Sequence, residues 1–495
     1  MEMSSHDLGP LGEPNVYEYL RVVRRELPRG IGDELQSSRA KMLLDMTLSL
    51  LDSLLCRDGV LEDAYALRCS GYGDAFDAFR DPSQSDSQRS INEGDAFEIV
   101  ERNIRASISK IHSKQTMPRL ELLNTLRGIL QSEAAFLNTI GEHEQSISTL
   151  VDVPNDAVSL DAESITAYLQ GRSETGLPVW VKSLGSPLGG YSKDVFVIEL
   201  DGAGRPADRL VIRRDLPNGP LESSVADEFE LLQTMHCAGI PVAEPLWLEL
   251  DTSKLGGPVM VSAFVEGDSP TDHRANVRDE NAVGKVRQFA QMLAAIHSVP
   301  VTSVTRQIPE FGLPVAQLIQ KLLNDFRDQW LRRRKAGNLV ISAALAWMES
   351  NIPQDEIDPV IVHGDYSLRN LLFVGEDVSA ILDWETWHIG DPAEDLAYCR
   401  PDVEAVMPWS EFLAEYRAAG GRAVSDERIF YWRFWKYLRG AITSISMMNA
   451  VTDKQAPADI RTAFGGVFFT RFCLTKICEF LNSEVEAMLN ESQLR

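Results

Sequence analysis

The chain has 495 residues, of which 44% are hydrophobic and 24% charged, so its length suits two or three domains of ordinary soluble composition. Its formal net charge is −25 and no block of lysine and arginine stands out, which argues against a nucleic-acid partner. No apolar run approaches the roughly 20 residues of a membrane span, and the N-terminus lacks the features of a signal peptide. Together with six scattered cysteines that form no CxxC pair, this predicts a cytoplasmic protein that does not bind membranes.

Residues 1–150 have the pattern of an all-α domain. In VYEYLRVVRREL the apolar residues Val16, Leu20, Val23 and Leu27 recur at helical spacing, and the later stretch MPRLELLNTLRGILQSEAAFLNTI repeats the pattern. This part of the sequence contains no arrangement of residues typical of a catalytic site. We therefore predict a regulatory or partner-like helical domain through which the chain could form a homo-oligomer.

The pattern changes to short strands in residues 151–264. VFVIEL and RLVIRRD are β-branched runs separated by the turn-forming stretch DGAGRPADR, and PLWLEL and PVMVSAFVEG have the same character. Helical patterns dominate again over most of residues 265–495. An α+β fold is expected, with the helical domain first, then a small β-rich lobe, then a larger helical lobe.

The stretch HGDYSLRN, residues 363–370, places His363, Asp365 and Asn370 between two apolar runs, and the hairpin that follows ends in ILDW at Asp383. This is the spacing of a phosphoryl-transfer catalytic loop. An aspartate can orient the acceptor hydroxyl and take its proton, while amide and carboxylate oxygens suit Mg²⁺. Each residue alone has a structural interpretation, as a cap or a turn residue, and we interpret the histidine as a scaffold. The combined spacing favours catalysis.

The segments IVHGDYSLRNLLF and ILDWETWHIGDPAEDLAY resemble the aminoglycoside phosphotransferase and choline kinase family. The resemblance covers about residues 155–482 and is most specific in the second half of that range. It implies that Asp365 is the catalytic base and that Asn370 and Asp383 hold magnesium.

The same resemblance implies a bilobal protein-kinase-like fold that binds ATP and Mg²⁺. The trailing GDPAEDLA matches a family segment, and we expect its Asp391 and Asp395 to buttress the catalytic loop.

The β-rich lobe should supply the nucleotide site. Gly189, Gly190 and Ser192 resemble the family's GG-x-S turn, whose backbone amides and hydroxyl can face phosphate oxygens, although a plain hairpin turn is equally consistent. The family often has a lysine on its third strand, but LVIRRD places Arg213 there, and Glu228 is positioned to pair with it from a helix. The hinge that would meet the adenine is expected at Ser262, Ala263 and Phe264.

The acceptor is less well specified. The sequences of these motifs are most similar to those of a branch of the family that phosphorylates hydroxyacyl-CoA, in which arginine also replaces the lysine. Four residues of YWRFWKYLRG would share one helix face and could hold an acyl-CoA, although packing of the tryptophans into the core is an alternative. These residues are Trp432, Trp435, Lys436 and Arg439.

Three functional hypotheses follow. The first is an ATP- and Mg²⁺-dependent kinase of a small hydroxylated molecule, with a hydroxyacyl-CoA or related metabolite as the preferred acceptor and an aminoglycoside as the alternative. The second is a pseudokinase scaffold, because the usual lysine is missing. The third is a helical oligomerisation protein based on residues 15–150 alone. The sequence does not distinguish ATP from GTP.

Overall fold

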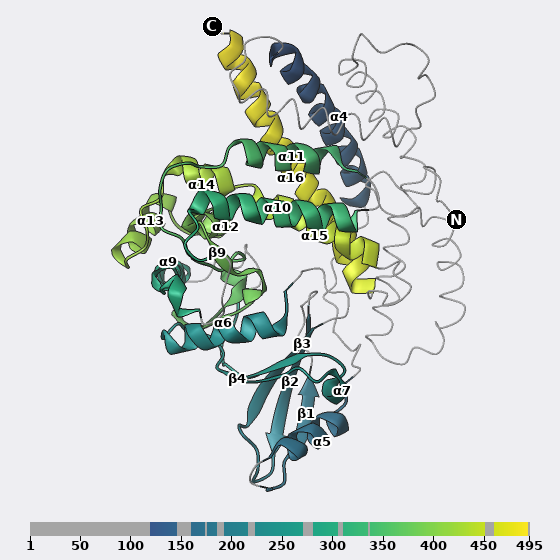
Figure 1. The fold of residues 1–495 in the computed structure, drawn as a ribbon, viewed down its shortest axis with the longest axis vertical. Coiled ribbons are helices and arrows are strands. Elements are labelled where there is room, and N and C mark those ends of the chain that lie inside the picture. Colours follow the sequence, from purple (N-terminus) through teal and green to yellow (C-terminus); the bar gives the residue numbers. More distant parts are fainter. Residues whose placement is uncertain are drawn as a thin grey trace, which may run out of the picture. The chain divides into compact units, whose positions relative to one another are not determined.

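The structure is a computed structural model, and Figure 1 shows its fold. It describes residues 119–145, 160–173, 176–185, 193–215, 223–270, 281–304, 310–334, 337–450 and 460–493. Most of the predicted helical domain therefore lies outside the described residues, as do Gly189, Gly190 and Ser192.

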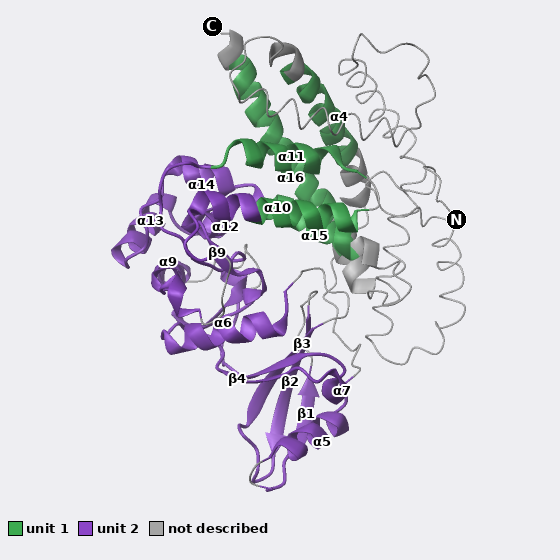
Figure 2. Cartoon of the chain, in the orientation of Figure 1, with its two compact units in different colours: residues 1–153, 322–352, 436–495 green, residues 154–321, 353–435 purple. Residues whose placement is uncertain are grey.

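The chain divides into two compact units, coloured separately in Figure 2. One unit takes in residues 1–153, 322–352 and 436–495, and the other takes in residues 154–321 and 353–435. The predicted domain boundaries at residues 150 and 264 remain predictions. The catalytic loop at residues 363–370, Asp383, Arg213 and Glu228 belong to the second unit, whereas Lys436 and Arg439 belong to the first.

The second unit contains a five-stranded antiparallel sheet with the order β1-β2-β3-β5-β4. Its strands are β1 (Trp180–Gly185), β2 (Lys193–Asp201), β3 (Arg209–Asp215), β4 (Pro245–Glu249) and β5 (Val259–Ala263). On β3, Leu210, Ile212 and Arg214 are buried on one face, and strand alternation therefore turns Arg213 toward the other. Arg213 lies opposite Val195 on β2 and opposite Met260 on β5.

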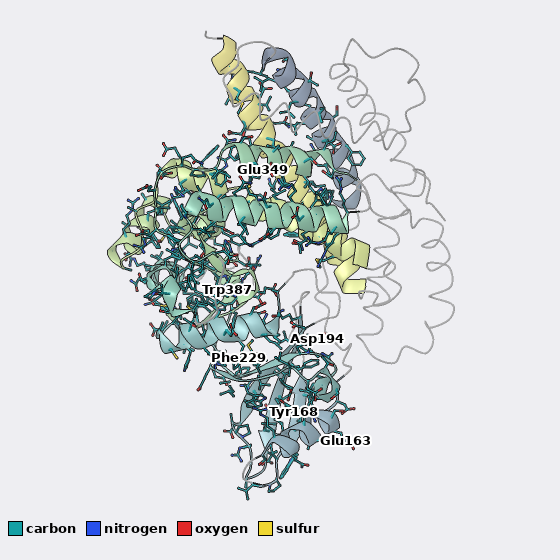
Figure 3. All side chains as sticks on the ribbon, viewed as in Figure 1. Glu163, Tyr168, Asp194, Phe229, Glu349 and Trp387 are labelled. Atoms are coloured by element: carbon teal, nitrogen blue, oxygen red, sulfur yellow. The ribbon has the colours of Figure 1, made fainter. Side chains whose placement is uncertain are left out.

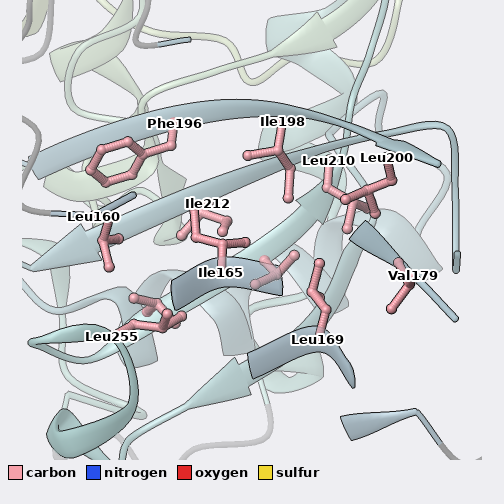
Figure 4. Packing of buried hydrophobic residues seen from close by; sticks show 12 residues of the cluster. Leu160, Ile165, Leu169, Val179, Phe196, Ile198, Leu200, Leu210, Ile212 and Leu255 are labelled. Atoms are coloured by element: carbon pink, nitrogen blue, oxygen red, sulfur yellow. The ribbon is translucent and has the colours of Figure 1, made fainter. Parts of the chain in front are cut away.

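The first face of the sheet packs against the helix α5 (Ala162–Arg172). Ile165 and Leu169 of α5 are buried in a cluster with Phe196 and Ile198 of β2 (Figure 4). At the edge of this cluster the Trp247 indole N–H donates a hydrogen bond to the hydroxyl of Tyr168, which is labelled in Figure 3. The face of the sheet away from the active site thus has an apolar core of its own.

The helix α6 (Val225–Cys237) contacts β3, β4 and β5. It begins at Ser224, whose hydroxyl accepts a hydrogen bond from the Asp227 amide. Val225, Leu231 and Met235 are buried at helical spacing, and Glu228 is buried among them. A carboxylate on the buried face of a helix requires a charged partner, and the sheet provides two of them.

The rest of the second unit consists of helices and two small sheets. Its helices are α7 (Thr252–Leu255), α9 (Ala282–Ser298), η3 (Val301–Ser303), η4 (Leu368–Asn370), η5 (Trp384–Thr386), α12 (Pro392–Glu404), α13 (Trp409–Ala418) and α14 (Asp426–Trp432). β6 (Val360–Val362) pairs with β9 (His388–Gly390), and β7 (Leu371–Val374) pairs with β8 (Asp377–Ile381). The predicted hairpin before Asp383 is confirmed, and β9 was not expected from the sequence.

In the first unit, α4 (Arg119–Gln145) packs along α16 (Ile460–Gln493), which also contacts α11 (Leu339–Ser350). The helix predicted at MPRLELLNTLRGILQSEAAFLNTI is therefore confirmed by α4. Two further helices, α10 (Val315–Arg333) and α15 (Trp435–Ala450), run across the boundaries of the two units. Among the described helices, none combines the length and apolar character of a membrane span. The α+β composition, with a β-rich region preceding a helical one, agrees with the predicted fold class.

Candidate active site

The catalytic-loop histidine is a scaffold residue. β6 is buried along its whole length and leads directly into His363, which is itself fully buried. The His363 Nε2–H donates to the Leu382 carbonyl oxygen at 2.9 Å, and Nδ1 accepts from the Asp365 amide at 3.2 Å. A neutral imidazole with its proton on Nε2 satisfies both bonds. The ring therefore joins the loop to the end of β8.

Asp395 of α12 holds the catalytic loop by hydrogen bonds to its backbone. Its two carboxylate oxygens accept hydrogen bonds from the backbone amides of His363 and Gly364, both at 2.8 Å, and Nε2 of His297 lies 3.1 Å from Oδ2. Burial acts to raise the pKa of Asp395, but the hydrogen bond and charge of His297 and the hydrogen bond from the His363 amide outweigh burial and hold the pKa below its ordinary value. The expected buttress is thus a direct contact for this residue.

Asp391 acts differently, because its contacts are to α12 and α14. It caps α12 by accepting from the Ala393 amide, and it accepts from Arg428 at 2.6 Å and from the Trp432 indole at 3.0 Å. Burial raises the pKa of Asp391, and the charge of Arg428 opposes that change. Arg428 is itself buried and was missed in the sequence, because nothing local distinguishes it from a solvated helix residue.

Asp365 and Asn370 are held together in a defined orientation. The Asn370 amide nitrogen donates to the Asp365 backbone oxygen at 2.8 Å and to its Oδ2 at 3.0 Å. The other carboxylate oxygen, Oδ1, accepts from Nη2 of Arg369 at 3.1 Å. Because the amide nitrogen of Asn370 faces Asp365, its Oδ1 is left for a metal ion. The Asp365 side chain is 20% exposed, so it remains accessible to a substrate.

A backbone hydrogen bond places Asp383 near Asp365 and Asn370. The Leu382 amide donates to the Asn370 carbonyl at 2.7 Å, so the two ends of the β7–β8 hairpin are fixed to each other. Asp383 has φ 65° and is the only non-glycine residue with positive φ in the described part of the chain. Such a conformation costs about 1–2 kcal/mol for an L-residue and is typical of functional sites. Its side chain is 46% exposed.

A buried cluster of charges joins the sheet to Asp383. Arg213 lies 2.7 Å from Glu228 and 3.2 Å from Asp383, and the Glu228 side chain is fully buried. Burial acts to lower the pKa of Arg213, but the charges of Glu228, Asp383 and Glu385 outweigh it and raise the pKa. The predicted pairing of Arg213 with Glu228 is thus present in the structure.

Lys193 is a member of this cluster that the sequence analysis missed. Its Nζ lies 3.3 Å from Glu228 and 2.9 Å from Asp215, and its side chain is 3% exposed. The register pairs Lys193 with Asp215 and Val195 with Arg213, so the two cations are two residues apart on the same face of the sheet. The signal in the sequence is a lysine at the start of a strand, directly after Ser192, but its partners Asp215 and Glu228 are 22 and 35 positions away.

The predicted hinge residues lie at the end of β5. Ser262 is buried, and the Ala263 amide donates to the Glu244 carbonyl at 2.9 Å, so this donor is used within the protein. The Arg209 guanidinium lies 3.4 Å from the centre of the Phe264 ring. Contact of these residues with an adenine stays a prediction.

The predicted aromatic helix face is not formed as one helix. α14 ends at Trp432 and α15 begins at Trp435, and both indoles are buried. The Trp435 N–H donates to Glu394 at 2.9 Å, while Trp432 donates to Asp391. Arg439 is also buried, and Lys436 is partly buried. The packing interpretation therefore accounts for the two tryptophans, and the prediction that the four residues share one helix face was wrong. Binding of an acyl-CoA by these residues stays a prediction.

The oxygen ligands present fit Mg²⁺. In the described part of the chain no three His, Cys, Asp or Glu side chains are grouped to hold a metal ion alone. Asn370 and Asp383 nevertheless offer one free amide oxygen and one half-exposed carboxylate. Mg²⁺ is usually bound by one or two carboxylates or amides and by substrate phosphates, so the residues present fit an ion that shares its ligands with a nucleotide.

Comparisons with known proteins identify one family. The model of the phosphotransferase enzyme family matches residues 185–438. Mouse acyl-CoA dehydrogenase family member 11 is 25% identical over 263 residues, which cover 50% of this chain and 32% of that protein. Mouse acyl-CoA dehydrogenase family member 10 is 28% identical over 200 residues, or 39% of this chain and 18% of that protein. The chain therefore spans less than a third of the length of these relatives.

A homoserine kinase from Methylocella silvestris is 27% identical over 274 residues, which cover 54% of this chain and 74% of that enzyme. Among solved structures, a putative aminoglycoside phosphotransferase from Ralstonia eutropha has a TM-score of 0.47 at 21% identity, covering 65% of this chain and 98% of that one. A macrolide 2'-phosphotransferase type I has a TM-score of 0.41 at 20% identity, covering 62% and 99%.

Proposed function

The chain belongs to the phosphotransferase enzyme family, and we propose that it is a small-molecule kinase that transfers the γ-phosphate of ATP to an alcohol with Asp365 as the base. The observation that carries this proposal is the fixed triad of Asp365, Asn370 and Asp383. The Asn370 side chain donates a hydrogen bond to Asp365. The Asn370 carbonyl accepts a hydrogen bond from the amide of Leu382, the residue before Asp383. Phosphoryl transfer depends chiefly on positioning and on charge neutralisation, and this arrangement supports both.

Each residue of the site has a separate role in the proposed reaction. Asp365 would accept a hydrogen bond from the acceptor hydroxyl, orient it toward the phosphate and take its proton as the new bond forms. Asn370 fixes the orientation of the carboxylate, and Asp395 prevents movement of the loop by binding two consecutive amides. A Mg²⁺ ion held by Asn370 and Asp383 would neutralise charge on the nucleotide phosphates. Arg213, which is paired with Glu228, supplies a fixed positive charge next to Asp383.

We propose a hydroxyacyl-CoA or a related hydroxylated metabolite as the acceptor. The relatives named as acyl-CoA dehydrogenase family members support the acyl-CoA class, and the relative named homoserine kinase supports a small hydroxy acid. An aminoglycoside is the competing class. A pseudokinase scaffold remains the second candidate function, and it is favoured by the presence of Arg213 where the family often has lysine.

A nucleotide-consumption assay across acceptors tests the proposal. The full chain is mixed with ATP and Mg²⁺, and ADP formation is followed with 3-hydroxybutyryl-CoA, 3-hydroxybutyrate, L-homoserine, kanamycin or choline. We expect ADP formation that depends on one class of acceptor and on Mg²⁺. Binding of ATP without consumption over the whole panel would favour the scaffold instead.

A further inference from the structure

Arg369 is a charged residue of the catalytic loop that the mechanism above does not use. It lies four residues after Asp365, and its side chain is 53% exposed. Its Nη2 donates to Asp365 Oδ1 at 3.1 Å and to the Tyr398 hydroxyl at 3.2 Å. These two bonds fix one edge of the guanidinium beside the reacting carboxylate. Among the described residues Nη1 and Nε of Arg369 have no hydrogen-bond partner.

The position of Arg369 relative to the acceptor follows from how Asp365 is held. Oδ2 of the carboxylate is bound by the amide nitrogen of Asn370, the proposed metal ligand. An acceptor hydroxyl bound at Oδ1 would lie about 2.7 Å from that oxygen. Because Nη2 of Arg369 is 3.1 Å from the same oxygen, the hydroxyl would lie within about 6 Å of the guanidinium. A substituent a few bonds from the hydroxyl that points toward Arg369 would then be within reach of Nη1 or Nε.

The guanidinium is positively charged at every pH at which the protein folds. Burial acts to lower the pKa of Arg369, but the charge of Asp365 and further contributions from Tyr398 and Asp402 outweigh it and raise the pKa. Asp402 has its own partner, the Leu368 amide at 3.0 Å. When Asp365 takes a proton from the acceptor its charge is neutralised, and the charge of Arg369 is then no longer balanced by that carboxylate.

From this geometry we infer that the acceptor carries a negative group, a carboxylate or a phosphate, a few bonds from the reacting hydroxyl, and that Arg369 binds it. The inference rests on the proposed kinase function and names the substrate class of that site. The charged guanidinium repels an ammonium group, and its remaining N–H donors, which lie on different edges of the group, can each donate to an oxygen of a carboxylate or a phosphate. A hydroxy acid meets this requirement, whereas an aminoglycoside or choline does not. Of the acceptors proposed above, this inference favours a free hydroxy acid over its CoA thioester, in which the carboxylate is lost, and the free acid is expected to react faster.

A matched series of acceptors tests this inference on the full chain. The compounds are 3-hydroxybutyrate, 3-hydroxybutanamide and 4-aminobutan-2-ol, which place a carboxylate, a neutral amide or an ammonium group near the same secondary hydroxyl. ADP formation at varied acceptor concentration gives kcat and KM for each. We expect kcat/KM to be highest for the acid, by about ten- to one-hundred-fold over the amide, which corresponds to one charge-assisted hydrogen-bond pair.

Variants of Arg369 separate binding of the acceptor from positioning of Asp365. Arg369→Gln should remove the preference for the acid, mainly by raising its KM, while the KM of the amide changes little. Arg369→Lys should retain part of the preference. Arg400→Gln is a suitable control, because Arg400 is an exposed arginine on α12 that pairs with Glu404.

The outcomes are distinguishable. Equal loss of kcat for all three compounds in Arg369→Gln would assign Arg369 to positioning only and overturn the inference. Preference of the wild-type chain for the amide or the amine would overturn it too, and both results leave the kinase assignment intact. Absence of ADP formation with every acceptor, these three and the larger panel, would overturn the proposed function and this inference together.

Discussion

Arg213 on β3 and Glu228 on α6 form a buried ion pair at 2.7 Å, and the same arginine reaches Asp383 at 3.2 Å. One side chain of the sheet is thus joined both to a helix and to the proposed metal ligand. Glu228 in turn holds a second cation, Lys193, at 3.3 Å. The replacement of the family's usual lysine by arginine is therefore accompanied by a lysine from the neighbouring strand.

Removing the shared carboxylate should be costly. Glu228→Gln leaves Arg213 and Lys193 buried without this partner, and we expect the free energy of unfolding to fall by about 3–5 kcal/mol. In Glu228→Gln/Lys193→Met one of the two cations is absent, so the double variant should be less destabilised than the sum of the single changes. Urea unfolding followed by tryptophan fluorescence measures all three. Additive effects would show that the two cations do not share Glu228.

The backbone conformation of Asp383 can be separated from its carboxylate. Asp383→Ala and Asp383→Gly both lose the carboxylate, but only glycine, which lacks a Cβ atom, adopts positive φ without strain. We expect the glycine variant to be more stable than the alanine variant by about 1 kcal/mol. Both should lose Mg²⁺-dependent ADP formation. Equal stabilities would contradict a strained backbone at this position.

Because Asp395 holds the catalytic loop, its replacement should lower both stability and turnover. Asp395→Asn keeps the shape of the side chain, but one of its two terminal atoms can no longer accept an amide hydrogen bond. We expect a loss of about 1–3 kcal/mol in the free energy of unfolding and a lower kcat. Affinity for ATP should be nearly unchanged, as measured by isothermal calorimetry. Asp402→Asn is the comparison variant, because Asp402 accepts a hydrogen bond from the loop amide of Leu368, whereas Asp395 accepts from the two amides of His363 and Gly364.

The pairing of His388 with Glu394 should make the free energy of unfolding depend on pH. Burial acts to lower the pKa of His388, but the charge and hydrogen bond of Glu394, 3.0 Å away, outweigh it and raise the pKa above 6.5. A pKa raised on folding stabilises the protein fully below the unfolded pKa, about 6.5, and this contribution is lost as pH rises through the folded value. The difference in unfolding free energy between wild type and His388→Gln should therefore shrink above about pH 6.5. A difference that grows with pH would have the wrong sign.

The hairpin and the site motif could be predicted from the sequence because their signals are local. The spacing from His363 to Asn370, the Gly-Glu-Asp turn and the aspartate at the end of the second strand all lie within 21 residues. The strands at 195–200 and 209–215 are likewise marked by their own β-branched residues. The pairing of Arg213 with Glu228 followed from the family resemblance, which supplies a long-range relation that local pattern does not.

The features that were missed depend on distant partners. Lys193, Arg428 and Asp402 resemble surface charges in the sequence, and only the fold shows which carboxylate or amide each one meets. The aromatic stretch after Arg428 was interpreted as one helix because its period is continuous, but the helix breaks between Trp432 and Trp435 so that both indoles can reach buried carboxylates. The short strand β9 is only three residues long, too short for a periodic signal.

Replacement of Asp365 by asparagine tests the central claim most directly. Asp365→Asn keeps the size of the side chain and one of its two accepting oxygens, but it cannot take a proton from the acceptor. Asp377→Asn, an exposed residue at the turn of the β7–β8 hairpin, is the matched control. With the best acceptor from the panel, we predict that Asp365→Asn lowers kcat by about 10²–10⁴-fold and leaves the Kd for ATP within a factor of about two. Turnover equal to that of the wild type in this variant would contradict the assignment of the base.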